Sequence, residues 1–144
     1  MKFSTKCRYG TRALVEIGRN YGVGPTKRRV ISRSQDISDS YLENILITLR
    51  NAGIIDTIRG ARGGYVLVKD PSQITLFEVV KALEGSLAPV DCLDNSDLCE
   101  RVNGCVTREV WYKVQVAKEN VLKEVTLKEL IEKDCKNNHR EYVI

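Results

Sequence analysis

The order of helical and extended patterns in the first 85 residues most constrains the fold of this chain. Three stretches with apolar residues at helical spacing come first, at about residues 4–19, 26–34 and 39–51. Two short β-branched or alternating runs follow, at 54–58 and 65–68, and then a helical stretch that ends at Gly85. Helix, short helix, tight turn, helix and hairpin in this order are typical of a winged helix-turn-helix. We therefore predict a mainly α fold with a small β-hairpin wing.

The third helical stretch has clear boundaries and one apolar face. Ser38 can cap it, or Ser40 can do so and form a capping box with Glu43. Gly53 stands where a left-handed residue ends a helix. The apolar face consists of Leu42, Ile45, Leu46 and Leu49. The opposite face is polar and is free to meet a partner.

That polar face suits the major groove of DNA, which is wide enough to admit one α-helix. Asn can bond adenine through two hydrogen bonds, Glu can accept one from cytosine, and Ser or Tyr can reach bases or phosphates. The candidate DNA-contacting residues here are Ser38, Ser40, Tyr41, Glu43, Asn44 and Arg50.

The segment between the two extended runs is a glycine-rich turn with two arginines, residues 59–64. Arg59 and Arg62 could reach phosphates or a narrow minor groove, whose negative potential attracts Arg. Gly60 would let the backbone approach DNA closely. Alone, such a turn is more often simply solvated than functional, but its place after a helix-turn-helix pattern favours DNA binding.

Charge is divided unevenly along the chain. Residues 1–64 carry twelve Lys and Arg against five Asp and Glu, whereas residues 65–144 carry eleven against fourteen. A basic half can bind a polyanion, because Lys and Arg release counterions from phosphates. The basic run 27–29 is explained equally well by solvation or by a non-specific phosphate contact. No apolar run has the length of a membrane span and no secretory signal is evident, so we expect a cytoplasmic, nucleoid-associated protein.

Three of the five cysteines, Cys92, Cys99 and Cys105, lie in a stretch without sustained periodicity. In a reducing compartment such thiolates favour iron–sulfur clusters, Zn or Cu(I) over disulfides. Their spacing differs from the C-x2-C pairs of common Zn sites. Elsewhere a lone cysteine is usually a small buried hydrophobe, which is the simplest expectation for Cys135 and an alternative for Cys7.

A long helix is predicted after this loop. Valines and one alanine recur along it at steps of four, three, four and four: Val110, Val114, Ala117, Val121 and Val125. This seam could pack within its own subunit, but a dimer interface is favoured because a palindrome needs a two-fold symmetric reader. The expected organisation is a DNA-binding domain (1–85), a cysteine loop (86–106), a dimerisation helix (107–125), and a short helix followed by a polar, frayed tail from Cys135 (126–144).

Three motifs in combination are specific: ISDSYLEN at 37–44, LRNAGII at 49–55 and RGARGGY at 59–65. With them the chain resembles the Rrf-two superfamily of bacterial regulators, and within it the IscR-type iron–sulfur regulators. The resemblance implies a homodimeric winged-helix transcription factor that binds a near-palindromic operator. It also implies that Ser40, Tyr41 and Glu43 take part in operator choice and that Arg59 points to the minor groove.

The resemblance further implies a 2Fe–2S cluster held by Cys92, Cys99 and Cys105. The fourth ligand departs from the family pattern. IscR-type proteins have a His where this chain has Arg108, which stays protonated and cannot ligate. Another branch uses a carboxylate of the partner subunit at the position of Arg8 here. The remaining candidates are Glu109, Cys7, Asp91, Asp94, Asp97, Glu100 and, least favoured, His139.

Together these patterns predict a homodimeric, repressor-type, sequence-specific DNA-binding regulator whose operator binding responds to a 2Fe–2S cluster. Its partners would be double-stranded palindromic DNA and a second copy, with cluster-assembly proteins as further candidates. A cluster-free thiol- or Zn-responsive repressor of the same fold is the alternative, followed by an iron–sulfur scaffold. An enzyme is disfavoured, because the sequence has neither a C-x-x-C pair nor a nucleophile–His arrangement.

Overall fold

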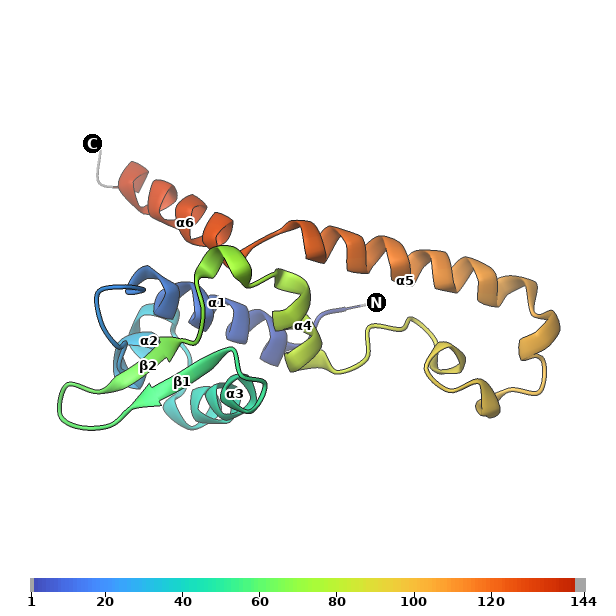
Figure 1. Ribbon diagram of the computed structural model, residues 1–144, viewed down its shortest axis with the longest axis horizontal. Coiled ribbons are helices and arrows are strands. Elements are labelled where there is room, and N and C mark those ends of the chain that lie inside the picture. The colour runs from blue at the N-terminus through green and yellow to red at the C-terminus, as the bar shows by residue number, and fades with distance from the viewer. Residues whose placement is uncertain (1, 142–144) are drawn as a thin grey trace.

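The structure is a computed structural model that describes residues 2–141. Its helices are α1 (Thr5–Arg19), α2 (Arg28–Gln35), α3 (Asp39–Asn51), α4 (Leu76–Glu84), α5 (Val106–Glu124) and α6 (Leu127–Glu141). One antiparallel hairpin joins β1 (Ile55–Ile58) to β2 (Gly64–Leu67). The predicted mainly α fold with a hairpin wing is confirmed, and Figure 1 shows α5 extending away from the compact helical body.

The core lies between α1, α2, α3 and α4. The predicted apolar face of α3 is buried in full, together with Leu14 and Ile17 of α1 and Ile31 of α2. Fully burying one such side chain contributes about 1.5–3 kcal/mol. A Cβ atom at Gly10 would lie 2.6 Å from Cδ1 of Leu83, so α1 and α4 pack closely. This core fixes the orientation of α3.

Local signals explain most helix ends. The Ser4 side chain accepts a hydrogen bond from the Cys7 amide and caps α1. At α3 the N-cap is Ser38, whose side chain makes no cap hydrogen bond with a described residue. The alternative capping box is not formed, because Ser40 already lies inside the helix and Glu43 pairs with a residue of α2. Gly53 has φ of 74°, as expected for the left-handed residue after this helix.

The second helix begins two residues later than predicted. The backbone of Thr26 forms a β-bridge with Tyr65, through N–O distances of 2.9 and 2.8 Å, and so cannot be helical. This bridge attaches the segment before α2 to β2 of the hairpin. A Cβ atom at Gly64 would lie 2.5 Å from the carbonyl oxygen of Thr26, so only glycine fits there. Strand β2 thus has a backbone partner on each edge, β1 on one side and Thr26 on the other.

The carboxyl-terminal helices differ from expectation. α6 continues through Cys135 to Glu141, where a short helix and a frayed tail were predicted, and Cys135 is exposed rather than buried. α6 packs on α1, since a Cβ atom at Gly18 would lie 2.4 Å from Cδ1 of Ile131. Of the described residues of α5, Leu122 alone is buried. Within residues 2–141, the helices are too short or too polar to cross a membrane.

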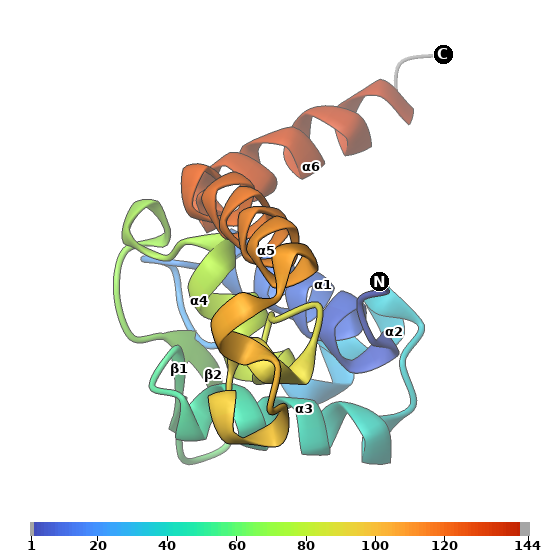
Figure 2. The same ribbon diagram turned by 90° about the vertical axis from the view of Figure 1, so that its right-hand side faces the viewer.

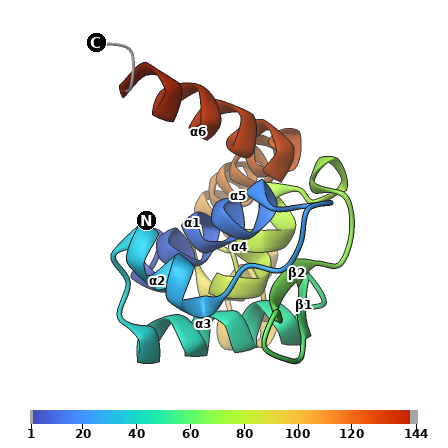
Figure 3. The ribbon, with the colours of Figure 1, turned by 90° about the vertical axis from the view of Figure 1, so that its left-hand side faces the viewer.

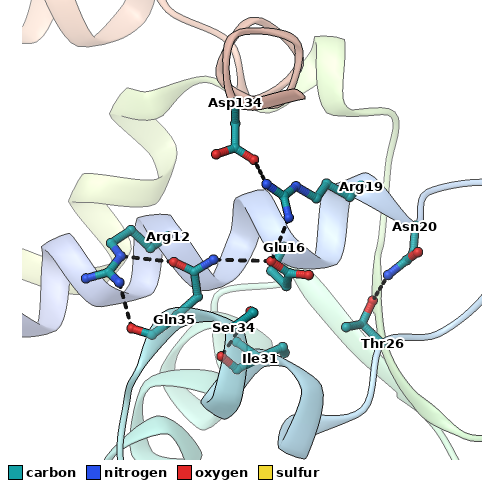
Figure 4. Close-up of polar contacts among 9 residues, drawn as sticks. All are labelled: Arg12, Glu16, Arg19, Asn20, Thr26, Ile31, Ser34, Gln35 and Asp134. Carbon is teal, nitrogen blue, oxygen red and sulfur yellow. Dashed lines mark hydrogen bonds and ion pairs between the residues drawn. The ribbon is translucent and has the colours of Figure 1, made fainter. Parts of the chain in front are cut away.

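A polar network crosses α1 and joins α2 to α6 (Figure 4). Arg12 donates to the side-chain and backbone oxygens of Gln35, at 3.0 and 2.6 Å, and Gln35 Nε2 donates to Glu16 at 3.2 Å. Arg19 pairs with the same Glu16 carboxylate at 3.1 Å and with Asp134 of α6. Glu16 is only 7% exposed, and a buried charge of this kind needs such partners. The end of α2, just before the turn into α3, is therefore tied to α6.

Candidate nucleic-acid interface and cysteine loop

The predicted DNA-contacting residues of α3 lie on its solvent side. Ser38, Ser40, Glu43, Asn44 and Arg50 are exposed, opposite the buried apolar face, and Tyr41 is half-buried. α3 and the hairpin lie along the same side of the molecule (Figures 1 and 3). We call this surface the α3–wing face; it consists of these six residues with Arg59, Gly60 and Arg62.

One further residue beside this surface was not predicted. Ile47 is 51% exposed and follows Glu43 and Asn44 by one helical turn on the same side of α3. An exposed apolar side chain at this place can contact the methyl group of thymine. The signal was present in the sequence, because Ile47 falls outside the apolar face formed by its neighbours.

Tyr41 is held by residues of α1. Its ring makes an edge-to-face contact with Tyr9, with centroids 6.0 Å apart and planes at 79°. The Arg12 guanidinium lies 5.4 Å from the centre of the Tyr9 ring. Aromatic pairs of this geometry contribute about 0.5–1.5 kcal/mol beyond burial. Tyr41 is therefore a positioned side chain and not a freely moving one.

Basic residues in α2 and immediately before it lie beside the first turn of α3. Lys27, Arg28, Arg29 and Arg33 line a surface hollow together with Asp39. Arg28 forms ion pairs with Asp39 at 2.9 Å and with Glu43 at 3.2 Å. The hydrogen bond to Asp39 raises the pKa of Arg28. The sequence revealed the basic run but not this pairing.

The hairpin presents its two arginines to solvent. Arg59, Gly60 and Arg62 are exposed, and Gly60 has φ of 112°, a conformation that favours glycine. The turn closes through a 3.0 Å hydrogen bond from Gly63 to Gly60. A Cβ atom at Gly63 would lie 2.0 Å from the carbonyl oxygen of Ile58, so this residue must also be glycine.

The cysteine loop was predicted at residues 86–106 and ends at 105, because α5 begins at Val106. It lies at the opposite end of the molecule from the hairpin tip (Figure 1), and Figure 2 views it end-on. It contains three single 3-10 turns: Asp91–Leu93, Ser96–Leu98 and Val102–Gly104. Cys99 is exposed and Cys92 and Cys105 are half-buried; all three thiols are free. Among the described residues, no three Cys, His, Asp or Glu side chains converge as a metal site would require. The three cysteines thus share one loop without forming a closed ligand set.

Residues in the first turn of α5 form hydrogen bonds with two of these cysteines. Sγ of Cys105 lies 3.2 Å from Oγ1 of Thr107, and this hydrogen bond, aided by the Arg108 amide and guanidinium, lowers the pKa of Cys105. Arg108 also donates to the carbonyl oxygen of Cys92, at 3.2 Å from Nη2 and 3.4 Å from Nε. A thiolate is the form that binds soft metals and reacts with electrophiles.

The candidate fourth ligands lie in different surroundings. Glu109 is exposed on α5 and pairs with Lys113 at 3.6 Å. Cys7 is 3% exposed in the core, where burial and the nearby Glu84 raise its pKa to about 11. Asp94 accepts a hydrogen bond from Ser86. The side chain of His139 lies outside the described residues. The three loop thiols are suitable ligands for a soft metal or an iron–sulfur cluster. Cys7, in contrast, is a residue of the hydrophobic core.

Comparison with known proteins gives a family match over most of this chain. The family model "Rrf2: Iron-dependent Transcriptional regulator" matches residues 3–133. The HTH-type transcriptional regulator CymR of Bacillus subtilis is 38% identical over 130 residues, which are 90% of this chain and 89% of that protein. The regulator IscR of Klebsiella pneumoniae is 34% identical over 131 residues, 91% of this chain and 80% of that protein.

Solved structures give the same result. Bacillus subtilis CymR, described as the global cysteine regulator, has a TM-score of 0.76 and covers 92% of this chain and 97% of its own. The IscR of T. potens has a TM-score of 0.76 at 34% identity and covers 93% and 88%. These relatives are transcriptional regulators and not enzymes. The chain therefore belongs to the Rrf2 family of DNA-binding transcriptional regulators, of the CymR and IscR type.

Proposed function

We propose that this protein is a homodimeric, cytoplasmic repressor that binds a palindromic operator through the α3–wing face. The observation that carries this proposal is the shared orientation of α3 and the hairpin. Polar side chains of one helix face solvent beside a tip with two exposed arginines. A helix in the major groove and arginines at phosphates or the minor groove would read one half-site.

The proposed dimer uses α5. Val110 and Val121 of the predicted seam are 52% and 63% exposed, so the seam does not pack within its own subunit at these positions. Several apolar residues exposed on one protruding helix are typical of a protein interface. If two copies of α5 pack across a two-fold axis, the two α3 helices would lie on successive half-sites of the operator.

The cysteine loop is the proposed sensor, with Cys92, Cys99 and Cys105 as ligands of a 2Fe–2S cluster. When bound, the cluster would supply a reversible one-electron redox change. Thr107 and Arg108 lower the pKa of Cys105 and would thereby favour its thiolate form, and Arg108 would hold the Cys92 backbone against α5. Because α5 also forms the proposed dimer interface, ordering of the cysteine loop and the spacing between the two α3 helices would be coupled. The coupling would be reciprocal: cluster binding would change operator affinity, and operator binding would change cluster affinity.

A cluster-free thiol sensor is the second candidate. Its support is the CymR relative, a cysteine regulator by description, together with the finding that no three Cys, His, Asp or Glu side chains of the described residues converge on one point. In this case the lowered pKa of Cys105 would make it the reactive thiol. A Zn-responsive repressor or a cluster scaffold would use the same three cysteines.

Two measurements test these proposals. The first is selection of duplexes from a random pool, followed by anisotropy titration at several salt concentrations. A regulator should prefer a palindrome to random duplex by about 10³-fold or more, with a steep salt dependence. Equal affinity for all duplexes would contradict the proposal.

The second measurement is the visible spectrum with iron and sulfide assays on anaerobically purified protein. The Cys92→Ala, Cys99→Ala, Cys105→Ala triple variant should be colourless, whereas Cys135→Ala, which removes an exposed cysteine outside the loop, should match the wild type. Colour in the triple variant would refute the cluster site. A colourless wild type would favour the thiol sensor, and zinc in place of iron would favour the Zn-responsive form.

A further inference from the structure

Arg28 uses its whole guanidinium group on two carboxylates of α3. Nε and Nη2 contact the two oxygens of Asp39, at 3.0 and 2.9 Å, and Nη1 contacts Oε1 of Glu43 at 3.2 Å. The fork on Asp39 fixes the plane of the guanidinium, since a bidentate pair leaves it little rotational freedom. The third nitrogen then determines where the Glu43 carboxylate lies.

Without this arginine the two carboxylates would be poorly placed. Asp39 and Glu43 are four residues apart on α3, so they lie on the same side of the helix, and like charges at this spacing repel. Asp39 has a favourable position at the helix amino terminus. Glu43 lies one turn later and gains no such benefit. Next to a phosphate backbone its negative charge would be repelled. Arg28 supplies the positive charge that offsets both.

The contact also leaves Glu43 able to read a base. Arg28 touches one carboxylate oxygen, Oε1, so the other can accept a hydrogen bond from the amino group of cytosine or adenine in the major groove. A carboxylate whose orientation is already fixed loses less conformational entropy on binding than a free one. Orientation and charge compensation therefore come from the same side chain.

We propose that Arg28 is a specificity-determining residue that aligns Glu43 for one base pair of each operator half-site. This inference rests on the proposed function, in which α3 enters the major groove. It assigns to Arg28 a role different from a plain phosphate contact. A phosphate contact changes affinity for all sequences alike, whereas an aligning residue changes the preference among bases at one position.

The competing explanation is that Arg28 only stabilises the corner between α2 and α3. The side chains of Arg28, Asp39 and Glu43 are 35%, 57% and 53% exposed. Ion pairs with this degree of exposure contribute little to stability. A stabilising role would therefore move the melting temperature slightly and leave base preference unchanged, so base preference separates the two explanations.

The test uses the full-length protein and the duplex selected from the random pool, with each base pair of one half-site replaced in turn. Affinities are measured for wild type, Arg28→Leu, Glu43→Ala and the double variant. Arg29→Leu is the matched control: it removes a positive charge from the same helix, at a residue that forms no ion pair with any described residue. Arg28→Lys keeps the charge without the fork, and replaces Arg28→Leu should that variant fail to fold.

Glu43→Ala should abolish a preference of about 5-fold or more at one base pair. Arg28→Leu should reduce that same preference at least about threefold, and the double variant should add nothing further. Arg29→Leu should weaken binding to all duplexes equally. An unchanged or larger preference in Arg28→Leu overturns the inference while the proposed function stands. If Glu43→Ala alters no base preference, the assignment of Glu43 itself is wrong. If no duplex is selected at all, the proposed function fails.

Discussion

The Arg108 guanidinium donates two hydrogen bonds to the carbonyl oxygen of Cys92 and thereby fastens the start of the cysteine loop to the first turn of α5. This is the position at which the IscR-type pattern has a ligand histidine. Here the same position connects loop and helix by hydrogen bonds to backbone. These hydrogen bonds therefore link the proposed sensor to the proposed dimer helix.

Replacing Arg108 by His should increase the iron and sulfide retained per protomer after anaerobic purification. A neutral imidazole can ligate iron, which a guanidinium cannot. Arg108→Gln is the matched control, because its amide can still donate to a carbonyl but is a poor ligand. Iron content that is no higher in Arg108→His than in Arg108→Gln would mean that the loop does not assemble a cluster around this position.

Alkylation should distinguish Cys105 from Cys7. Contact with Thr107 lowers the pKa of Cys105, so its reactive thiolate is present at lower pH than that of an ordinary thiol and increases as pH rises through this lowered value. Cys7 is buried with a pKa raised to about 11, and should react only when the protein unfolds. Iodoacetamide rates of the reduced apo protein, followed by peptide mass spectrometry from pH 6 to 10, would show this order.

Thr107→Val removes the hydroxyl at nearly constant volume and should move the alkylation midpoint of Cys105 upward. The Cys99 rate serves as an internal reference, because Cys99 is exposed in the same loop. A midpoint that does not move would show that the hydroxyl has no influence on this thiol.

The parts of the fold that follow from local patterns were predictable. α3 was located to the residue, because four buried side chains repeat at helical spacing and Gly53 must adopt positive φ. The hairpin was predictable too, because two β-branched or alternating runs flank a glycine-rich turn. In that turn Gly60 has positive φ, and Gly63 leaves no room for a Cβ atom.

The parts that depend on distant partners were not predictable. α6 has a polar sequence, and its carboxyl-terminal half is fixed by contacts such as Arg19 with Asp134, 115 residues apart. The start of α2 depends on the Thr26 bridge to Tyr65, which the local sequence does not reveal. In the candidate site, the proposed DNA-contacting residues were found from the pattern of α3, whereas the pairing of Arg28 with Glu43 depends on the packing of two helices. The arrangement of the loop cysteines has no periodicity from which it could be inferred.

Val121→Glu should convert the dimer to a monomer. The Val121 side chain is exposed on the seam of α5, so a charge there costs little in the isolated subunit but would be buried without a partner in the dimer. Asn120→Glu adds the same charge at the adjacent exposed polar position and should remain dimeric. Sedimentation velocity at several concentrations measures the effect. A Val121→Glu variant that sediments as a dimer would place the interface elsewhere.

Arg59→Ala and Arg62→Ala should weaken operator binding without lowering stability. Both side chains are exposed at the hairpin tip, and neither forms an ion pair with another described residue. Each phosphate contact that is lost should reduce the slope of log affinity against log salt by about 0.9. An Arg that enters the minor groove should in addition lose preference for A·T-rich flanks when removed. Anisotropy titrations between 50 and 200 mM salt, on the selected duplex and on a G·C-flanked version, separate the two modes.

Gly63→Ala provides the contrasting variant on the same hairpin. Its new Cβ atom would meet the Ile58 carbonyl oxygen at 2.0 Å, so the turn must distort although both arginines remain. Binding should fall as far as in the arginine variants, and the melting temperature should fall as well. If Gly63→Ala binds DNA normally while Arg59→Ala does not, the contribution of Arg59 to binding does not depend on the conformation of the turn. If neither arginine variant changes affinity or salt slope, the hairpin does not touch DNA, and recognition rests on α3 alone.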